Sequence, residues 1–81
     1  IQPNPVANAA TLSLRLANSA DVRIRVIDLS GRLVKEFQTQ SLGAGTQSIP
    51  LDVSDINQGA YAVVVSTTGG RENRSVMMVK K

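Results

Sequence analysis

The stretch Asp28-Leu29-Ser30-Gly31-Arg32 lies between two runs of alternating apolar residues, and it decides the fold class. Leu29 and Ser30 can take right-handed turn angles, and Gly31 can supply the positive φ that closes a three-residue hairpin loop. Asp28 and Arg32 should then face each other across the loop mouth as an opposite-charge pair. The stretch therefore predicts a β-hairpin.

The segments before the hairpin alternate apolar and polar residues. This period of two is typical of half-buried antiparallel strands with one solvated face, and it predicts strands over residues 11–16 and 21–28. Residues 18–20 should turn the chain between them. The side chains expected to point inward are those of Leu12, Leu14, Leu16, Val22, Ile24 and Val26.

The segment after the hairpin, residues 32–39, breaks the period. Counting back from the loop pairs Val34 with Val26, and strict pairing would then set Glu36 against Ile24, toward the core. One extra residue near Lys35-Glu36 would bring Phe37 opposite Ile24 instead. We predict a β-bulge there, because a bulge costs less than an unpaired buried carboxylate.

The middle of the chain predicts a loop over residues 41–45, a strand over 47–53 and one helical turn over 52–59. Pro50 has no N–H to donate, so its strand should lie at a sheet edge or point that nitrogen to solvent. Ser54 fits the N-cap of the turn, and Gly59 fits a left-handed exit. The strand should bury Ile49, Leu51 and Val53.

The C-terminal third predicts a second hairpin. Residues 61–67 are the most apolar run, so we expect a central strand that is covered on both faces. Gly69-Gly70 fits a two-residue turn that pairs Val63 with Val76 and Tyr61 with Met78, and the last strand covers 75–80. With no helical period elsewhere, the chain is predicted to be one all-β domain, residues 1–81: a small Ig-like antiparallel β-sandwich of six or seven strands.

The composition excludes most catalytic chemistry. The 81 residues contain no Cys and no His, which removes disulfides, zinc sites, and triads or proton shuttles that need imidazole. Only Phe37 and Tyr61 are aromatic, and no serine has a base beside it. The net charge of +3 is spread along the chain, which indicates solubility rather than a nucleic-acid footprint. We expect no enzyme, no cofactor, no metal, no small-molecule substrate and no nucleic-acid partner.

Two charged clusters have alternative interpretations. Asp52 and Asp55 are the only close carboxylate pair, and capping of a short turn explains them better than a glycosidase pair or a calcium loop. If residues 11–16 pair with 21–28, Arg15 lies opposite Arg23, and Arg25 extends a basic patch. Solvent and neighbouring acids can relieve that patch, or it can serve as an anion-binding or docking face. A second basic cluster near the C-terminal hairpin comprises Arg71, Arg74, Lys80 and Lys81.

No stretch is long and apolar enough to cross a membrane as a helix. The chain opens at Ile1 without Met, so we expect it to be part of a larger precursor.

Several short motifs follow one another in a fixed order along essentially the whole chain. They are Pro3-Asn4-Pro5, Asp28-Leu29-Ser30-Gly31-Arg32-Leu33-Val34, Gly43-Ala44-Gly45 with Ile49 and Leu51-Asp52, Gly59-Ala60-Tyr61, and Val76-Met77-Met78-Val79-Lys80. Each motif is weak alone, but the ordered set with its terminal apolar strand resembles the type IX secretion system C-terminal sorting domains (type A, Ig-like).

The resemblance implies a non-catalytic domain with a cargo protein fused at its N-terminal side. The cargo would pass through the periplasm and then cross the outer membrane, to remain at the cell surface or become extracellular. Protein components of the outer-membrane export and sortase-like machinery would be the partners. The alternative is a non-catalytic Ig-like or fibronectin-like accessory module of a secreted enzyme, which binds carbohydrate or acts as a spacer.

Two sets of residues follow from this hypothesis. A strongly apolar strand that ends the given chain, with basic residues near its hairpin, is suited to being gripped or paired by a partner. The residues expected to carry recognition are Val76, Met77, Met78, Val79, Lys80 and Lys81, with Arg71 and Arg74. The residues expected to serve the fold are Pro3, Asn4, Pro5, Asp28, Gly31, Arg32, Gly59 and Tyr61.

Overall fold

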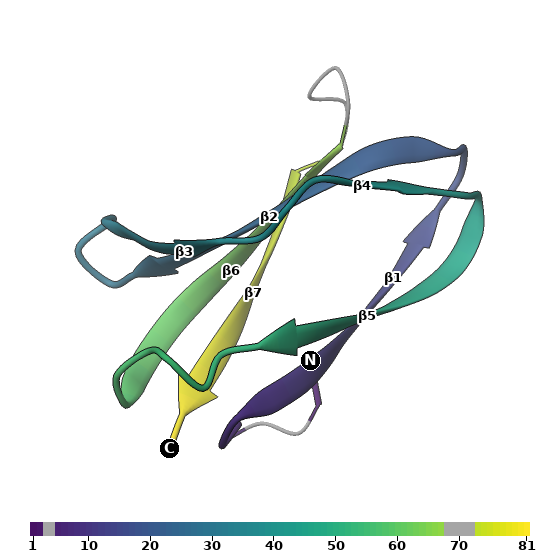
Figure 1. Ribbon diagram of the computed structural model, residues 1–81. Helices are drawn as coiled ribbons and strands as arrows, with labels where there is room; N and C mark the ends of the chain where they lie inside the picture. Colours follow the sequence, from purple (N-terminus) through teal and green to yellow (C-terminus); the bar gives the residue numbers. More distant parts are fainter. Residues whose placement is uncertain (3–4, 68–72) are drawn as a thin grey trace.

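The computed structural model describes residues 1–2, 5–67 and 73–81, and it contains seven strands and no helix in that part of the chain (Figure 1). The predicted all-β class and strand number are confirmed. The strands are β1 (Ala9–Leu16), β2 (Ala20–Asp28), β3 (Leu33–Glu36), β4 (Gln40–Leu42), β5 (Gly45–Asp52), β6 (Gly59–Thr67) and β7 (Asn73–Lys80).

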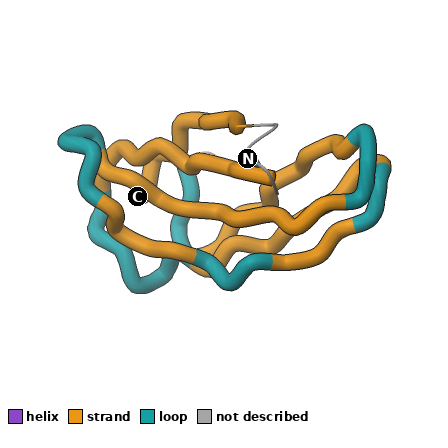
Figure 2. Tube along the Cα trace, turned by 90° about the horizontal axis from the view of Figure 1, so that it is seen from above, coloured by secondary structure: helices purple, strands orange, loops and turns teal. Residues whose placement is uncertain are grey.

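The strands form two antiparallel sheets. One sheet pairs β1 with β5, and the other has the order β3-β2-β6-β7, with β4 also pairing with β2. Figure 2 shows the strands enclosing a common interior, as expected for a β-sandwich. The predicted sandwich architecture is therefore confirmed.

The core lies between the sheets and draws on both of them. Every strand of the described chain that contributes to it does so with alternate residues, because successive side chains of a strand point to opposite faces. The buried hydrophobic residues are Val6, Ala10, Leu12, Leu16, Val22, Ile24, Val26, Ile49, Leu51, Val53, Ile56, Tyr61, Val63, Val65 and Met78.

The expected pairing of residues 11–16 with 21–28 is wrong, because β1 and β2 belong to different sheets. Arg15 lies opposite Thr46 of β5, whereas Arg23 lies opposite Ser66 of β6. Alternation shows which face of a strand is buried but not which strand lies beside it. The three residues between β1 and β2 carry the chain across the sandwich, so Arg15 does not face Arg23.

A bulge does interrupt the β2–β3 pair, but one position before the expected one. Val26 pairs with Lys35 and Ile27 pairs with Leu33, so the extra residue is Val34 and its expected pairing with Val26 is wrong. The expected position of Phe37 opposite Ile24 is confirmed, since the Phe37 N–H donates to the Ile24 carbonyl at 2.9 Å.

The expected loop over residues 41–45 contains a short strand instead. β4 pairs with the start of β2, and the Ser41 hydroxyl donates to Asp21 at 2.6 Å. The loop shrinks to Gly43 and Ala44, after which Gly45 opens β5 with a φ of +102°. A three-residue strand is too short to show alternation, so no periodic signal predicts it.

The predicted helical turn over residues 52–59 is wrong, because Asp52 ends β5, Gly59 begins β6, and residues 53–58 between them form turns and bends without helix. The Asp52 carboxylate accepts from the Ser54 N–H at 3.0 Å and from the Ser54 hydroxyl at 2.7 Å. Asp52, rather than Ser54, is therefore the capping residue. The same side-chain-to-backbone bonding satisfies a tight turn and a helix start, which is why the pattern fits both.

The last hairpin has the predicted register, with Tyr61 opposite Met78 and Val63 opposite Val76. The predicted turn at Gly69-Gly70 lies outside the described residues. β6 is central, as expected, but only one of its faces is covered: Val63 is fully buried, whereas its neighbours Ala62 and Val64 are half-buried. Pro50 lies on β5, which among the described strands pairs only with β1 and is therefore an edge strand, as expected for this residue.

Candidate recognition surface

β7 is an edge strand of the larger sheet and pairs along its length with β6. Its side chains divide between the two faces of the sheet. Val76, Met77 and Val79 are 39%, 55% and 43% exposed, whereas Met78 is fully buried. Lys80 also points inward and is only 8% exposed. Of the six residues from Val76 to Lys81 that were expected to carry recognition, Met78 and Lys80 are therefore part of the packed interior.

The end of β7 is held by the N-terminal segment. The Val6 N–H donates to the Val79 carbonyl at 2.7 Å, and the Lys81 N–H donates to the Val6 carbonyl at 2.8 Å. These bonds form a parallel bridge between Val6 and Lys80, and the Val6 side chain is fully buried. The two distant parts of the chain thus fix the position in which Met77 and Val79 are presented.

The outer face of the larger sheet carries an apolar row that crosses four strands. Leu33 pairs with Ile27, Ile27 with Ala62, and Ala62 with Met77. The two ends of this row, Leu33 and Met77, are 50% and 55% exposed, and the two middle residues are half-buried. Exposed apolar side chains that are contiguous across a sheet mark a contact surface more often than scattered ones do.

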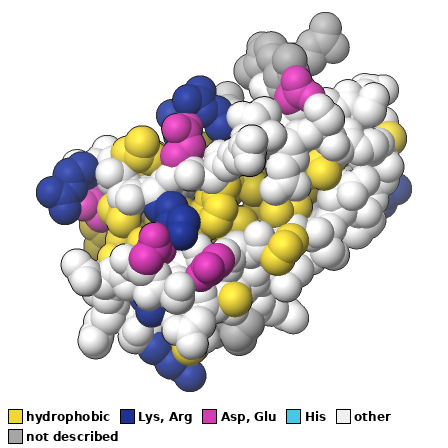
Figure 3. Space-filling view, viewed as in Figure 1, with side chains coloured by type: hydrophobic (Ala, Val, Ile, Leu, Met, Phe, Trp, Pro, Cys, Tyr) yellow, Lys and Arg dark blue, Asp and Glu magenta, His cyan; other side chains and the backbone are white. Residues whose placement is uncertain are grey.

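The charged side chains do not form the basic patch expected from the sequence. Arg23 donates to Glu36 at 2.7 Å, which confirms that neighbouring acids relieve this arginine. Arg25 lies between Glu36 and Val64 on the outer face, and its Nε is buried without a hydrogen-bond partner among the residues described. Figure 3 shows basic and acidic side chains interspersed on the visible face.

In the second basic cluster, Arg74 and Lys81 are exposed, Lys80 is buried, and Arg71 lies outside the described residues.

The carboxylate pair is explained by local bonding. Hydrogen bonds from the Ser54 N–H and hydroxyl lower the pKa of Asp52, and the hydrogen bond from Lys35, at 2.8 Å, lowers the pKa of Asp55. The general acid of a glycosidase needs a raised pKa, whereas the pKa values of these two carboxyls are lowered. Within residues 1–2, 5–67 and 73–81, no three side chains of the metal-binding types cluster together.

The first hairpin has the predicted geometry. Gly31 has a φ of +89°, its N–H donates to the Asp28 carbonyl at 3.0 Å, and Arg32 Nε lies 3.4 Å from the Asp28 carboxylate. Sequence reasoning missed the larger role of Asp28. Its Oδ1 accepts from the Ser30 hydroxyl at 2.6 Å and from the N–H groups of Ser30 and Arg32 at 3.0 Å each.

A second motif residue anchors the turn before β6. The Tyr61 hydroxyl donates to the Asn57 carbonyl at 2.6 Å, while its ring is buried. Gly59, between them, has a φ of +150°, which L side chains rarely adopt. Pro5 is exposed, and Pro3 and Asn4 lie outside the described residues.

The family model for secretion system C-terminal sorting domains matches residues 1–80 of the 81-residue chain. The chain belongs to this family. It therefore carries a type IX sorting signal, and such a signal implies export to the cell surface or the extracellular space. Comparison with curated proteins and with solved structures finds no match. The described residues contain no helix of the length and apolarity needed to cross a membrane.

Proposed function

We propose that this domain is a non-catalytic sorting signal, recognised as a folded unit by protein components of the type IX export and sortase-like machinery. A cargo protein fused at its N-terminal side would pass through the periplasm and then cross the outer membrane with it. Family membership over nearly the whole chain supports this function. The composition agrees with it, since the chain has neither His nor Cys, and of its two close carboxylates Asp52 bonds to Ser54 and Asp55 to Lys35.

The recognition surface within that proposal is the outward part of β7. Met77 and Val79 lie on the exposed face of the larger sheet, and Lys81 follows at the end of the given chain. The bridge from Val6 holds this part of the strand in one position. A machine that must read many different cargoes needs a signal with a fixed shape, and a braced strand with exposed apolar side chains provides one.

The accessory-module alternative receives no support from the aromatic residues. Stacking on a sugar ring needs an exposed aromatic side chain. Tyr61 is buried, and Phe37 is half-buried beside the core, where the Lys35 ammonium lies 5.3 Å from its ring centroid.

A transfer experiment tests the function. Residues 1–81 are fused to the C-terminus of a fluorescent reporter that carries a signal peptide for the periplasm, in a bacterium with a type IX system. We expect the reporter at the cell surface or in the medium, and we expect it to stay in the periplasm when the domain is omitted or the export system is inactivated. An identical distribution with and without the domain would contradict the proposal.

Deletion of residues 76–81 is a coarse version of this experiment. Unchanged export after that deletion would remove the idea that β7 carries recognition. Loss of export would be ambiguous, because the deletion also removes the fully buried Met78 and the strand that pairs with β6. Side-chain substitutions that spare the core separate the two explanations.

A further inference from the structure

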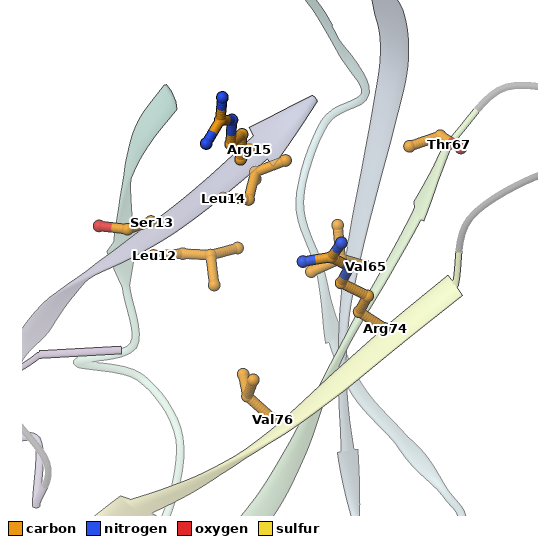
Figure 4. A pocket seen from close by; sticks show the side chains of 8 residues that line it. All are labelled: Leu12, Ser13, Leu14, Arg15, Val65, Thr67, Arg74 and Val76. Atoms are coloured by element: carbon orange, nitrogen blue, oxygen red, sulfur yellow. The ribbon is translucent and has the colours of Figure 1, made fainter. Parts of the chain in front are cut away.

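An apolar groove opens between the two sheets, on the side where β1 and β7 are the outermost strands. Figure 4 shows Leu12 and Leu14 of β1 on one side of it, with Val65 of β6 and Val76 of β7 on the other. Val76 belongs to the same face of β7 as the fully buried Met78, yet it is 39% exposed. The smaller sheet therefore leaves this part of the interior face of β7 uncovered.

The edge of β1 that borders the groove has unused backbone groups. The N–H and C=O of Thr11 bond to Gln2, on the side away from β5. Groups two residues further along an extended strand point the same way, so those of Ser13 and Arg15 also point away from β5. Outside the strand ladders, no backbone hydrogen bond among the described residues involves Ser13 or Arg15. An extended segment can bond to such an edge.

Two arginines line the same groove. Arg15 comes from β1 and Arg74 from β7, and both are exposed. The ion pairs in the described structure involve Arg23, Arg32 and Lys35, so neither groove arginine is neutralised by an acid there. The site thus combines an apolar floor, an open strand edge and two positive charges that form no ion pair with a described residue.

We propose that this groove binds an extended, acidic peptide segment of a partner protein, which adds as a strand to the free edge of β1. Alternate apolar side chains of the segment would contact Leu12, Leu14 and Val76. Its carboxylates would pair with Arg15 and Arg74. A second copy of this domain suits the groove less well, because the domain carries a net charge of +3. Arg74 and Val76 belong to the residues expected to carry recognition, so this inference deepens the proposed function. It rests on that function only for the claim that the partner takes part in export.

Peptide titration tests the groove independently of export. The probe is the pentapeptide Ac-Thr-Val-Glu-Val-Asp-amide, added to the ¹⁵N-labelled domain and followed by NMR. We expect saturable shifts of the amides of residues 12–16 and 73–76. The same peptide with lysine in place of its two acids should not bind. Absence of saturable shifts, or equal binding of both peptides, would overturn the proposal.

Matched variants locate the charge contribution. Arg15→Gln combined with Arg74→Gln should weaken binding by about tenfold, on the order of threefold for each exposed charge. Arg23→Gln combined with Arg32→Gln removes the same charge outside the groove, at side chains that are also exposed, and should leave the dissociation constant within about twofold. Thermal unfolding checks that both variants fold. Equal weakening by the two pairs, or concentration-dependent shifts of the same amides without peptide, would contradict an acidic partner in this groove.

Discussion

The Tyr61 hydroxyl donates a 2.6 Å hydrogen bond to the backbone carbonyl of Asn57, four residues earlier. This contact ties the turn before β6 to the first buried side chain of that strand. A tyrosine that bonds back to the corner preceding its own strand is a recurring device in Ig-like sandwiches. It gives the Gly59-Ala60-Tyr61 motif a structural reason, and it leads to the first prediction.

Tyr61→Phe should destabilise the domain by about 1 to 2 kcal/mol, because it removes the donor and leaves a partly buried carbonyl without a partner. Urea unfolding followed by circular dichroism measures the change, and the midpoint should fall while the denaturant slope stays constant. An unchanged midpoint would show that water replaces the hydroxyl at no cost.

Gly31→Ala should cost about 1 to 2 kcal/mol through backbone strain alone. Its φ is +89°, and a Cβ built there would meet nothing within 4 Å, so crowding plays no part. Gly43→Ala is the matched control, since Gly43 has no positive φ and its Cβ would meet only Gln47 Nε2, at 3.9 Å. Gly31→Asn should recover part of the loss, because asparagine tolerates positive φ. Equal losses at positions 31 and 43 would contradict this account of the hairpin.

Asp28 should make stability depend on pH in the acid range. Hydrogen bonds from the Ser30 hydroxyl and the Arg32 N–H hold the pKa of its carboxyl below the ordinary value of 3.8. The folded state therefore binds this proton more weakly than the unfolded state does. The stabilisation is complete above pH 3.8 and is lost as the pH falls through the lower, folded-state pKa.

The difference in unfolding midpoint between the wild-type protein and Asp28→Asn measures this effect. The difference should be constant near neutral pH and should shrink below pH 3.8. An NMR titration of the Asp28 carboxyl gives its pKa directly. A difference that grows on acidification would have the wrong sign for a lowered pKa.

Adjacent valines on β6 should respond differently to truncation. Val63 is fully buried between the sheets, so Val63→Ala should cost about 2 to 3 kcal/mol. Val64 is half-buried on the outer face, and Val64→Ala should cost less than about 1 kcal/mol. Denaturant unfolding of the two variants compares the faces of one strand. Equal costs would mean that something covers the outer face as well.

That same strand shows what the sequence could and could not predict. The run Val63-Val64-Val65 marks a central strand correctly, because it must be apolar enough to lie between two others. It does not show that only one face is covered, since apolar side chains are tolerated on a half-buried face. The loop closed by the positive φ at Gly31 was predictable from that local cause, but the bulge at Val34 shifted the register that follows it. The register of the last hairpin was predictable throughout.

Pairing between distant strands was not predictable from such local causes. Nothing in the alternation of Leu12, Leu14 and Leu16 shows that β1 pairs with β5 rather than with β2. Misplacing β1 also misplaced Arg15, which was assigned to a patch with Arg23 but lies beside the groove with Arg74. The apolar terminal strand was visible in the sequence, whereas its division into buried Met78 and exposed Met77 depends on the sheet that covers it.

The central claim is that exposed side chains of β7 are the part of the signal that the export machinery reads. Met77→Gln combined with Val79→Thr removes apolar surface there without touching the core. Leu29→Gln combined with Val34→Thr is a matched control around the first hairpin, outside the apolar row that contains Met77, where the two side chains are 74% and 36% exposed. Both variants should remain folded by circular dichroism.

The deciding measurement is the fraction of a fused reporter that reaches the cell surface or medium for these two double variants. We predict a severalfold loss of export for the Met77 and Val79 variant and none for the Leu29 and Val34 variant. Equal export of the two folded variants would contradict the claim that the export machinery recognises the terminal strand.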